Sequence, residues 1–147
     1  MGKTVQDAMT VDPVTIDRSG SAVDAARIME SADVGSVPVV EQGTPIGIVT
    51  DRDIVVRAIA EGRDPRMGRV PEAMTADVVS VPDTADVKEA ARLMKDRQIR
   101  RIVVVDSNKR VVGIVSLGDI AVDAHDDKMS GDVLEKVSKD AVTVGNR

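Results

Sequence analysis

The chain of 147 residues contains the same sequence twice, and this repeat is the strongest constraint on its fold. The segment GIVTDRDI at 47–54 recurs as GIVSLGDI at 113–120, and AMT at 8–10 recurs at 73–75. The two copies align without a gap as far as the turn near Asn108, where the second copy has one inserted residue. A duplication with two copies predicts a paired domain rather than a solenoid.

Both copies predict the same order of elements. A short apolar strand is followed by a helix, a β-hairpin and a second helix, which gives β-α-β-β-α in each copy. Ser21 with Asp24, and Asp86 with Glu89, have the spacing of a capping box before the first helix. The strands consist almost entirely of Val and Ile with little alternation, which indicates that both sheet faces are covered. We therefore expect an α/β (α+β) fold of two repeats related by a pseudo-twofold axis, with the sheets packed together and the helices outside.

The copies and their flanking segments define the expected division of the chain. The segment between the copies contains two prolines and a glycine, which is typical of a linker. The C-terminal segment has no counterpart in the first copy. We expect one module composed of a first repeat at 5–62, a linker at 63–72, a second repeat at 73–125 and a tail at 126–147.

The composition argues against several classes of function. The chain has no cysteine and one histidine, His125, so it cannot form a disulfide, a thiolate metal site or a site of several histidines. The net charge of −5 and the absence of Phe, Tyr and Trp disfavour nucleic-acid binding, which uses basic surfaces and aromatic stacking. No pair of nucleophile and base is recognisable, so we expect no metal, no nucleic acid and no enzymatic activity.

The distribution of apolar residues bears on membranes and location. No apolar run approaches the roughly 18 residues of a membrane-spanning helix. The first residues, MGKTVQDAMT, lack the apolar core of a signal peptide. We therefore expect a cytoplasmic protein without a membrane partner.

The repeated octapeptide places a hydroxyl and a carboxylate three residues apart where a strand ends and a helix begins. Thr50 and Asp53 have this spacing in the first copy, and Ser116 and Asp119 have it in the second. One interpretation is structural, because Ser/Thr-x-x-Asp is a capping box and an acid is favourable at the positive end of a helix dipole. The other is functional, because a carboxylate at such a position can accept hydrogen bonds from the two hydroxyls of a ribose. The sequence leaves both interpretations open.

The ordered set of motifs resembles the cystathionine-β-synthase (CBS) domain family. The matching motifs are AMT, the VTI strand, the SVPVV and RIVVV strands and the two GIV phrases, and the resemblance covers about 5–125. Two such repeats are similar to a Bateman module, as found in IMP dehydrogenase and in the γ subunit of AMP-activated kinase. The segment TDRDIVVRAIAEGRDP also resembles small stand-alone prokaryotic CBS-pair proteins of hypoxia and stress responses. Some relatives of that kind hold zinc, for which this chain lacks the ligands.

The resemblance implies two clefts between the repeats that bind adenosine compounds such as AMP, ADP, ATP, S-adenosylmethionine or NAD. In each cleft the hydroxyl and the carboxylate come from one copy and the facing strands come from the other. Because the chain has no aromatic residue, the adenine would lie between aliphatic side chains. Carried over by position, cleft one consists of Thr50, Arg52 and Asp53 facing Thr75, Val79, Ile99, Arg100, Arg101 and Val103, and cleft two consists of Ser116 and Asp119 facing Thr10, Val14, Val34, Gly35, Ser36 and Pro38.

The two implied clefts differ in charge. Cleft one contains Arg52, Arg100 and Arg101, whereas cleft two has Gly35 and Ser36 where cleft one has its arginine pair. Guanidinium groups bind phosphate in a bidentate manner. We therefore predict that cleft one prefers a phosphorylated nucleotide, and that cleft two prefers a less charged adenosyl group or stays empty. The alternative for Arg100 and Arg101 is a solvated charge pair before a buried strand.

Two functions follow from these expectations. The first is a regulatory nucleotide sensor, in which the ligand favours one shape by differential affinity and so changes the contact with an unidentified regulated protein. The alternative is a ligand-free homodimeric scaffold, in which Asp53 and Asp119 only cap helices. The resemblance also implies a homodimer formed through the apolar faces of the helices at 51–61 and 117–124.

Overall fold

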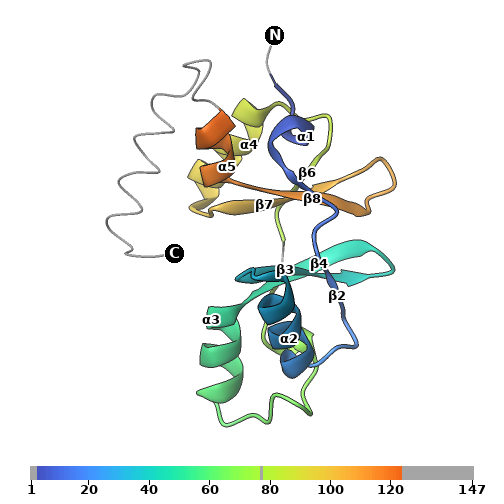
Figure 1. Cartoon of the computed structure of the whole chain (residues 1–147), viewed down its shortest axis with the longest axis vertical. Helices are drawn as coiled ribbons and strands as arrows, with labels where there is room; N and C mark the ends of the chain where they lie inside the picture. The colour runs from blue at the N-terminus through green and yellow to red at the C-terminus, as the bar shows by residue number, and fades with distance from the viewer. Residues whose placement is uncertain (1–2, 77, 124–147) are drawn as a thin grey trace.

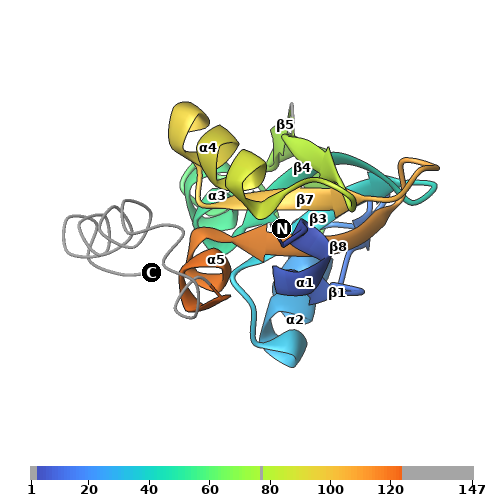
Figure 2. The ribbon, with the colours of Figure 1, turned by 90° about the horizontal axis from the view of Figure 1, so that it is seen from above.

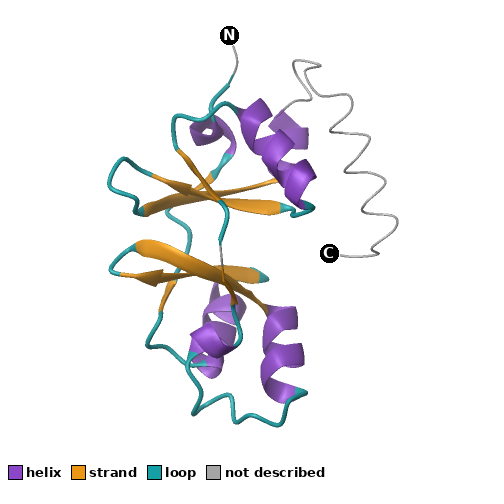
Figure 3. Ribbon diagram, turned by 180° about the vertical axis from the view of Figure 1, so that it is seen from behind, coloured by secondary structure: helices purple, strands orange, loops and turns teal. Residues whose placement is uncertain are grey.

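The computed structural model of the chain describes residues 3–76 and 78–123. It consists of two four-stranded sheets that face each other, with the helices on the outer side of each sheet (Figure 1 and Figure 3). This arrangement confirms the predicted α/β fold with helices outside. His125 and the predicted tail at 126–147 lie outside the described residues. Within the described ranges, no helix is long and apolar enough to cross a membrane.

The first half of the molecule contains most of the first repeat. Its sheet has the order β2-β3-β4-β5, with β2 parallel to β3 and the other neighbours antiparallel. The elements of this half are β2 (Ile16–Asp17), α2 (Ala22–Ala32), β3 (Ser36–Glu41), β4 (Thr44–Thr50), α3 (Asp51–Asp53), η1 (Ile54–Ile59), η2 (Val70–Glu72) and β5 (Thr75–Ala76).

The second half contains most of the second repeat. Its sheet has the order β1-β8-β7-β6, in which β6 is parallel to β7 and the other neighbours are antiparallel. Seen from above, β7 and β8 lie over β3 and β4 (Figure 2). The elements of this half are α1 (Val5–Ala8), β1 (Thr10–Val11), β6 (Ser80–Pro82), α4 (Val87–Arg97), β7 (Arg101–Val105), β8 (Val111–Ser116) and α5 (Leu117–Asp123).

Each sheet receives one strand from the other repeat, which the sequence did not predict. β1 precedes the first repeat's helix but pairs with β8, and β5 follows the linker but pairs with β4. The sheets therefore have four strands, and not the three of the predicted β-α-β-β-α order. The helical turns that precede these strands pack in the same halves as the strands. Val5 of α1 is 0% exposed in the core of the second half, and Val70 of η2 is 0% exposed in the core of the first half.

A methionine of one repeat packs on a glycine of the other at each exchanged strand. A Cβ atom added to Gly113 would occupy the place of the Met9 sulfur. A Cβ atom added to Gly47 would lie 2.5 Å from the Met74 sulfur and 2.8 Å from the carbonyl oxygen of Thr75. Real Cβ atoms do not approach so closely, so only glycine lets the AMT segment lie against the GIV segment. This contact explains why both motifs occur in both repeats.

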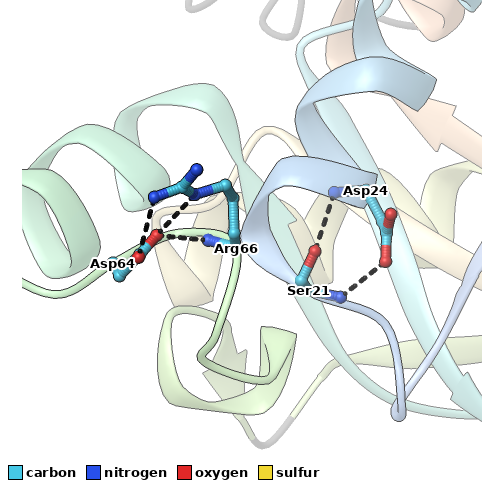
Figure 4. Close-up of polar contacts among 4 residues, drawn as sticks. All are labelled: Ser21, Asp24, Asp64 and Arg66. Atoms are coloured by element: carbon cyan, nitrogen blue, oxygen red, sulfur yellow. Dashed lines mark hydrogen bonds and ion pairs between the residues drawn. The ribbon is translucent and has the colours of Figure 1, made fainter.

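The capping of the first long helix in each repeat differs. Ser21 donates its amide to the Asp24 carboxylate (3.0 Å), and the Asp24 amide donates to the Ser21 hydroxyl (3.1 Å), which confirms the predicted capping box (Figure 4). These hydrogen bonds, led by the Ser21 amide, hold the pKa of Asp24 below its usual 3.8. In the second repeat, Asp86 accepts from the Lys88 amide at 2.9 Å, and not in the box predicted with Glu89.

The connection between the repeats packs against the first half. Asp64 accepts two hydrogen bonds from the Arg66 guanidinium at 3.2 Å each, which lower the pKa of Asp64 and raise that of Arg66 (Figure 4). Further along, the Val70 amide donates to the Gly20 carbonyl at 2.7 Å. The segment at 63–72 is therefore tied to the first half, and its last residues form η2.

The helix expected at 51–61 is not a regular α-helix. After α3 it continues as the π-helix η1, in which the Ala60 amide donates to the Val55 carbonyl at 2.8 Å. The Arg63 amide donates to the Ala58 carbonyl in the same i→i+5 pattern at 2.9 Å. The matching helix α5 of the second repeat is an α-helix. Single π-turns are rare and occur often at functional sites.

The methionine–glycine contact predicts the effect of a single methyl group. Gly113→Ala should lower the free energy of unfolding by about 1–3 kcal/mol, the usual cost of overpacking, measured by urea denaturation. Gly118→Ala is the matched control, because its Cβ would meet nothing closer than the Ser116 hydroxyl at 3.6 Å. A Gly113→Ala protein as stable as the wild type would contradict this account of the exchanged strands.

Candidate functional site

The facing surface of the first sheet can be assigned from strand alternation. Val37, Val39 and Val49 belong to the core beneath the helices. Their neighbours along the strands therefore point to the opposite side, toward the second sheet. Cross-strand pairs share a face, and Ser36 is paired with Thr50. This facing surface of the first sheet consists of Ser36, Pro38, Val40, Ile48 and Thr50.

The second sheet has an equivalent facing surface. Ile102, Val104 and Val115 lie in the core beneath its helices. Arg101 is paired with Ser116 on the opposite side. The facing surface of the second sheet consists of Arg101, Val103, Val105, Ile114 and Ser116.

The exchanged strands add residues of the other repeat to these surfaces. Thr75 is paired with Ile48, and Thr10 is paired with Ile114, so both threonines lie on the facing surfaces. The expectation for cleft one placed Thr75 opposite Thr50. The structure instead places Thr75 in the same sheet as Thr50, two positions away along β4, so the two hydroxyls are neighbours on one face.

The structural interpretation of the repeated octapeptide is confirmed. The Thr50 amide donates to Asp53 Oδ2 at 2.9 Å, and the Asp53 amide donates to the Thr50 hydroxyl at 3.0 Å. Ser116 and Asp119 make the same two bonds at 3.1 and 3.0 Å. Among the described residues, Oδ1 of each aspartate has no hydrogen-bond partner. The caps therefore leave one carboxylate oxygen at each site for a further hydrogen bond.

The backbone joins each cap to the neighbouring strand in the same way. The Asp51 amide donates to the Gly35 carbonyl, and the Leu117 amide donates to the Arg100 carbonyl, at 3.1 and 3.0 Å. These two bonds are equivalent positions of the repeats. They hold the cap of Ser116 and Asp119 beside Arg100, and the cap of Thr50 and Asp53 beside Gly35. The predicted cleft one would therefore combine the Thr50 cap with arginines of the facing sheet.

The three arginines assigned to cleft one differ from other arginines of the chain. Arg18 and Arg63 form ion pairs with Glu41 and Glu72, at 3.1 and 3.2 Å. Within residues 3–76 and 78–123, by contrast, no ion pair or side-chain hydrogen bond holds the guanidinium groups of Arg52, Arg100 and Arg101. These cationic groups are therefore available to an anion.

The aliphatic residues assigned to the two clefts differ in exposure. Val14 and Val34 of cleft two are 40% and 39% exposed. Their counterparts in cleft one, Val79 and Ile99, are half-buried and pack against the core of the second half. Val103 is 0% exposed, so in this conformation it lies between the sheets and not on an open wall of cleft one.

Val14 also differs from the prediction of a strand beginning at that residue. β2 begins at Ile16, so Val14 lies in the preceding loop. Pro38, assigned to the same cleft, is buried between the sheets. The residues assigned to cleft two therefore include exposed apolar side chains of loops and hydroxyls from the facing surfaces of both sheets.

Comparison with known proteins identifies the family. Residues 5–59 and 68–124 each match the CBS domain. The chain belongs to the CBS-domain family. CBS domain-containing protein YhcV of Bacillus subtilis is 40% identical over 92% of this chain and 95% of its own length. Hypoxic response protein 1 of Mycobacterium tuberculosis is 32% identical over 80% of this chain and 82% of its own length.

Two solved CBS-pair structures with bound ligands are similar to this one. The crystal structure of CBSX2 in complex with AMP has a TM-score of 0.73 and 29% identity, covering 86% of this chain and 99% of that one. The CBS pair of protein MJ0100 was solved with 5-methylthioadenosine and S-adenosyl-L-methionine. Its TM-score is 0.72 at 31% identity, covering 83% of this chain and 95% of that one.

A third similar structure is that of Hypoxic Response Protein I with two coordinated zinc ions. It has a TM-score of 0.75 and 30% identity, and it covers 82% of this chain and 98% of that one. In the part of the present chain that the structure describes, no group of three or more His, Cys, Asp or Glu side chains could hold a metal ion.

The capping geometry predicts how Asp53 contributes to stability. Asp53→Ala removes the acceptor of the Thr50 amide and should lower the free energy of unfolding by about 1 kcal/mol, the typical net value of such a bond. Asp53→Asn retains an acceptor oxygen and should lower it by clearly less. Equal losses in urea denaturation of the two variants would show that the charge, and not the hydrogen bond, stabilises the helix start.

Proposed function

We propose that the protein is a regulatory module that binds adenosine ligands between its repeats and acts on a partner protein through a change of shape. Related CBS pairs bind AMP, or methylthioadenosine and S-adenosylmethionine, according to their structures. The observation that supports the proposal most concerns Arg100 and Arg101, just before and at the start of β7: within residues 3–76 and 78–123, neither guanidinium makes an ion pair or a side-chain hydrogen bond. Two guanidinium groups next to a sheet surface with hydroxyl groups suit a phosphorylated nucleoside.

The two clefts differ in the charge of the ligand that they prefer. Cleft one takes AMP, ADP or ATP, because its arginines bind phosphate while Asp53 accepts hydrogen bonds from the ribose. Cleft two has Gly35 and Ser36 at the positions that match Arg100 and Arg101, and its exposed Val14 and Val34 suit an uncharged adenosyl group. Its Ser116 is the cross-strand neighbour of Arg101, so the proposal requires the Arg101 guanidinium to extend toward the facing sheet and cleft one. A ligand that prefers one separation of the sheets over another shifts the population of that shape, and this is how a signal reaches the partner.

A thermal-shift series tests ligand binding directly. A ligand at 100 times its dissociation constant should stabilise the protein by about 2.7 kcal/mol. AMP, ATP, S-adenosylmethionine and NADH form the panel, and mass spectrometry of small molecules released from the purified protein identifies a co-purified ligand. We expect a rise in Tm with AMP or ATP. A flat response to all four compounds would favour the second candidate function.

The second candidate is a homodimeric scaffold without a ligand. It is favoured by the exposed apolar face of η1, where Val55, Val56 and Ile59 are 54%, 45% and 57% exposed. Other residues of the predicted dimer faces are buried within the chain itself, namely Ile54, Ala58, Ile120 and Ala121. The dimer that we propose is therefore formed through η1, and sedimentation that shows a monomer at micromolar concentration would contradict it.

The role of the arginine pair can be measured with a charge-matched control. The double variant Arg100→Ala/Arg101→Ala should weaken ATP or AMP binding more than tenfold, equivalent to at least about 1.4 kcal/mol, in isothermal titration calorimetry. Arg92→Ala/Arg97→Ala removes the same charge from α4, outside the proposed clefts, and should leave the affinity within about threefold because exposed charges are screened. Unchanged affinity in the first variant would refute the assignment of phosphate to cleft one.

A further inference from the structure

We propose that Arg57 is a positioning residue for cleft one, because it fixes the strand that contributes Thr75; the proposal rests on the function assigned to that cleft. Its guanidinium Nη1 donates to the carbonyl oxygen of Met74 at 2.9 Å and lies 3.4 Å from that of Ala73. Both carbonyls lie between η2 and β5. Carbonyls at the end of a helical turn lack partners within it, and a guanidinium supplies them with charged donors.

The strand that Arg57 fixes has few other contacts of its own. β5 contains two residues, and its register consists of Ala76 opposite Gly47 and Thr75 opposite Ile48. A slip of one residue would turn the Thr75 hydroxyl to the helix side of the sheet. The bonds to the carbonyls directly before Thr75 oppose such a slip, and they keep its hydroxyl on the face that Thr50 occupies.

The second repeat has no arginine at the position equivalent to Arg57. When Gly47 is aligned with Gly113, the position equivalent to Arg57 is Asp123. A carboxylate cannot donate a hydrogen bond to a carbonyl. The strand β1, which contributes Thr10 to cleft two, is therefore not fixed by an arginine from that position. This difference makes cleft one more preorganised than cleft two, and preorganisation raises affinity because less freedom is lost on binding.

Neighbouring arginines show that the contact is specific to Arg57. Arg63 and Arg69 line the same hollow between η1, η2 and α2. Arg63 forms an ion pair with Glu72 at 3.2 Å, and Arg69 donates to the Ser19 carbonyl at 3.0 Å. Neither is bonded to the residues directly before β5. Arg63→Met is therefore a matched control, because it removes a guanidinium from the same hollow without touching this strand.

The test compares Arg57→Met, Arg57→Lys and Arg63→Met in the full chain. Amide hydrogen exchange of residues 75–76 is measured without ligand. Methyl NMR follows AMP binding near Val79 for cleft one and S-adenosylmethionine binding near Val14 for cleft two. Arg57→Met should speed exchange of β5 and weaken AMP binding about tenfold in cleft one, with no change in cleft two. Arg57→Lys should recover part of both effects, because an ammonium group still donates, and Arg63→Met should match the wild type.

Two results would overturn the proposal. One is an Arg57→Met protein with wild-type exchange and wild-type affinity, and the other is an equal loss in both clefts, which indicates general destabilisation. If the wild-type protein binds no AMP at all, the proposed function fails. The exchange rates alone then test whether Arg57 positions β5. Faster exchange of β5 in Arg57→Met but not in Arg63→Met supports this role, and equal exchange rates in the two variants contradict it.

Discussion

The exchange of two short strands is the interaction on which the rest of the structure depends. β1 and β5 contain two residues each, too few to hold a sheet edge by backbone pairing alone. They are stabilised by what precedes them, since Val5 and Val70 are buried in the opposite cores and Met9 and Met74 pack on glycines. The repeats are thus joined by two exchanged strands, one in each sheet. Separating the repeats would remove a strand from both sheets, so each facing surface always contains residues of both repeats.

The functional residues depend on the same framework. The caps at Thr50 and Ser116 have nearly equal geometry, and so do the backbone bonds that join each helix start to its neighbouring strand. The side chains around these equivalent backbones differ, with Arg100 and Arg101 beside the Ser116 cap and Gly35 and Ser36 beside the Thr50 cap. A backbone held by glycine contacts and caps tolerates different charges, so the same fold can offer two sites of different electrostatic character.

Local patterns in the sequence predicted the duplication, the first long helix and the hairpin of each repeat, and three of the four proposed capping boxes, because periodicity and caps act over a few residues. The strand exchange could not be predicted, since so short a strand has no periodicity and β1 pairs with β8 near the other end of the described chain. The π-helix η1 also has no local pattern that distinguishes it from α5. The burial of Val103 and the exposure of Val34 depend on how the halves pack. The Asp86 cap depends on which backbone amide lies within hydrogen-bond distance of its carboxylate, and this is the amide of Lys88.

The exchanged strands also have a consequence for the origin of the molecule. One copy by itself would have an unpaired sheet edge, and its first strand would have no sheet to pair with. A second identical chain would supply both partners, so the unduplicated ancestor would have been an obligate dimer whose chains exchanged their first strands. Gene duplication and fusion would then have replaced the association of two molecules by an intramolecular contact at high effective concentration. After such a fusion the two halves no longer had to be identical, which permitted equivalent positions such as Arg100 and Gly35 to diverge.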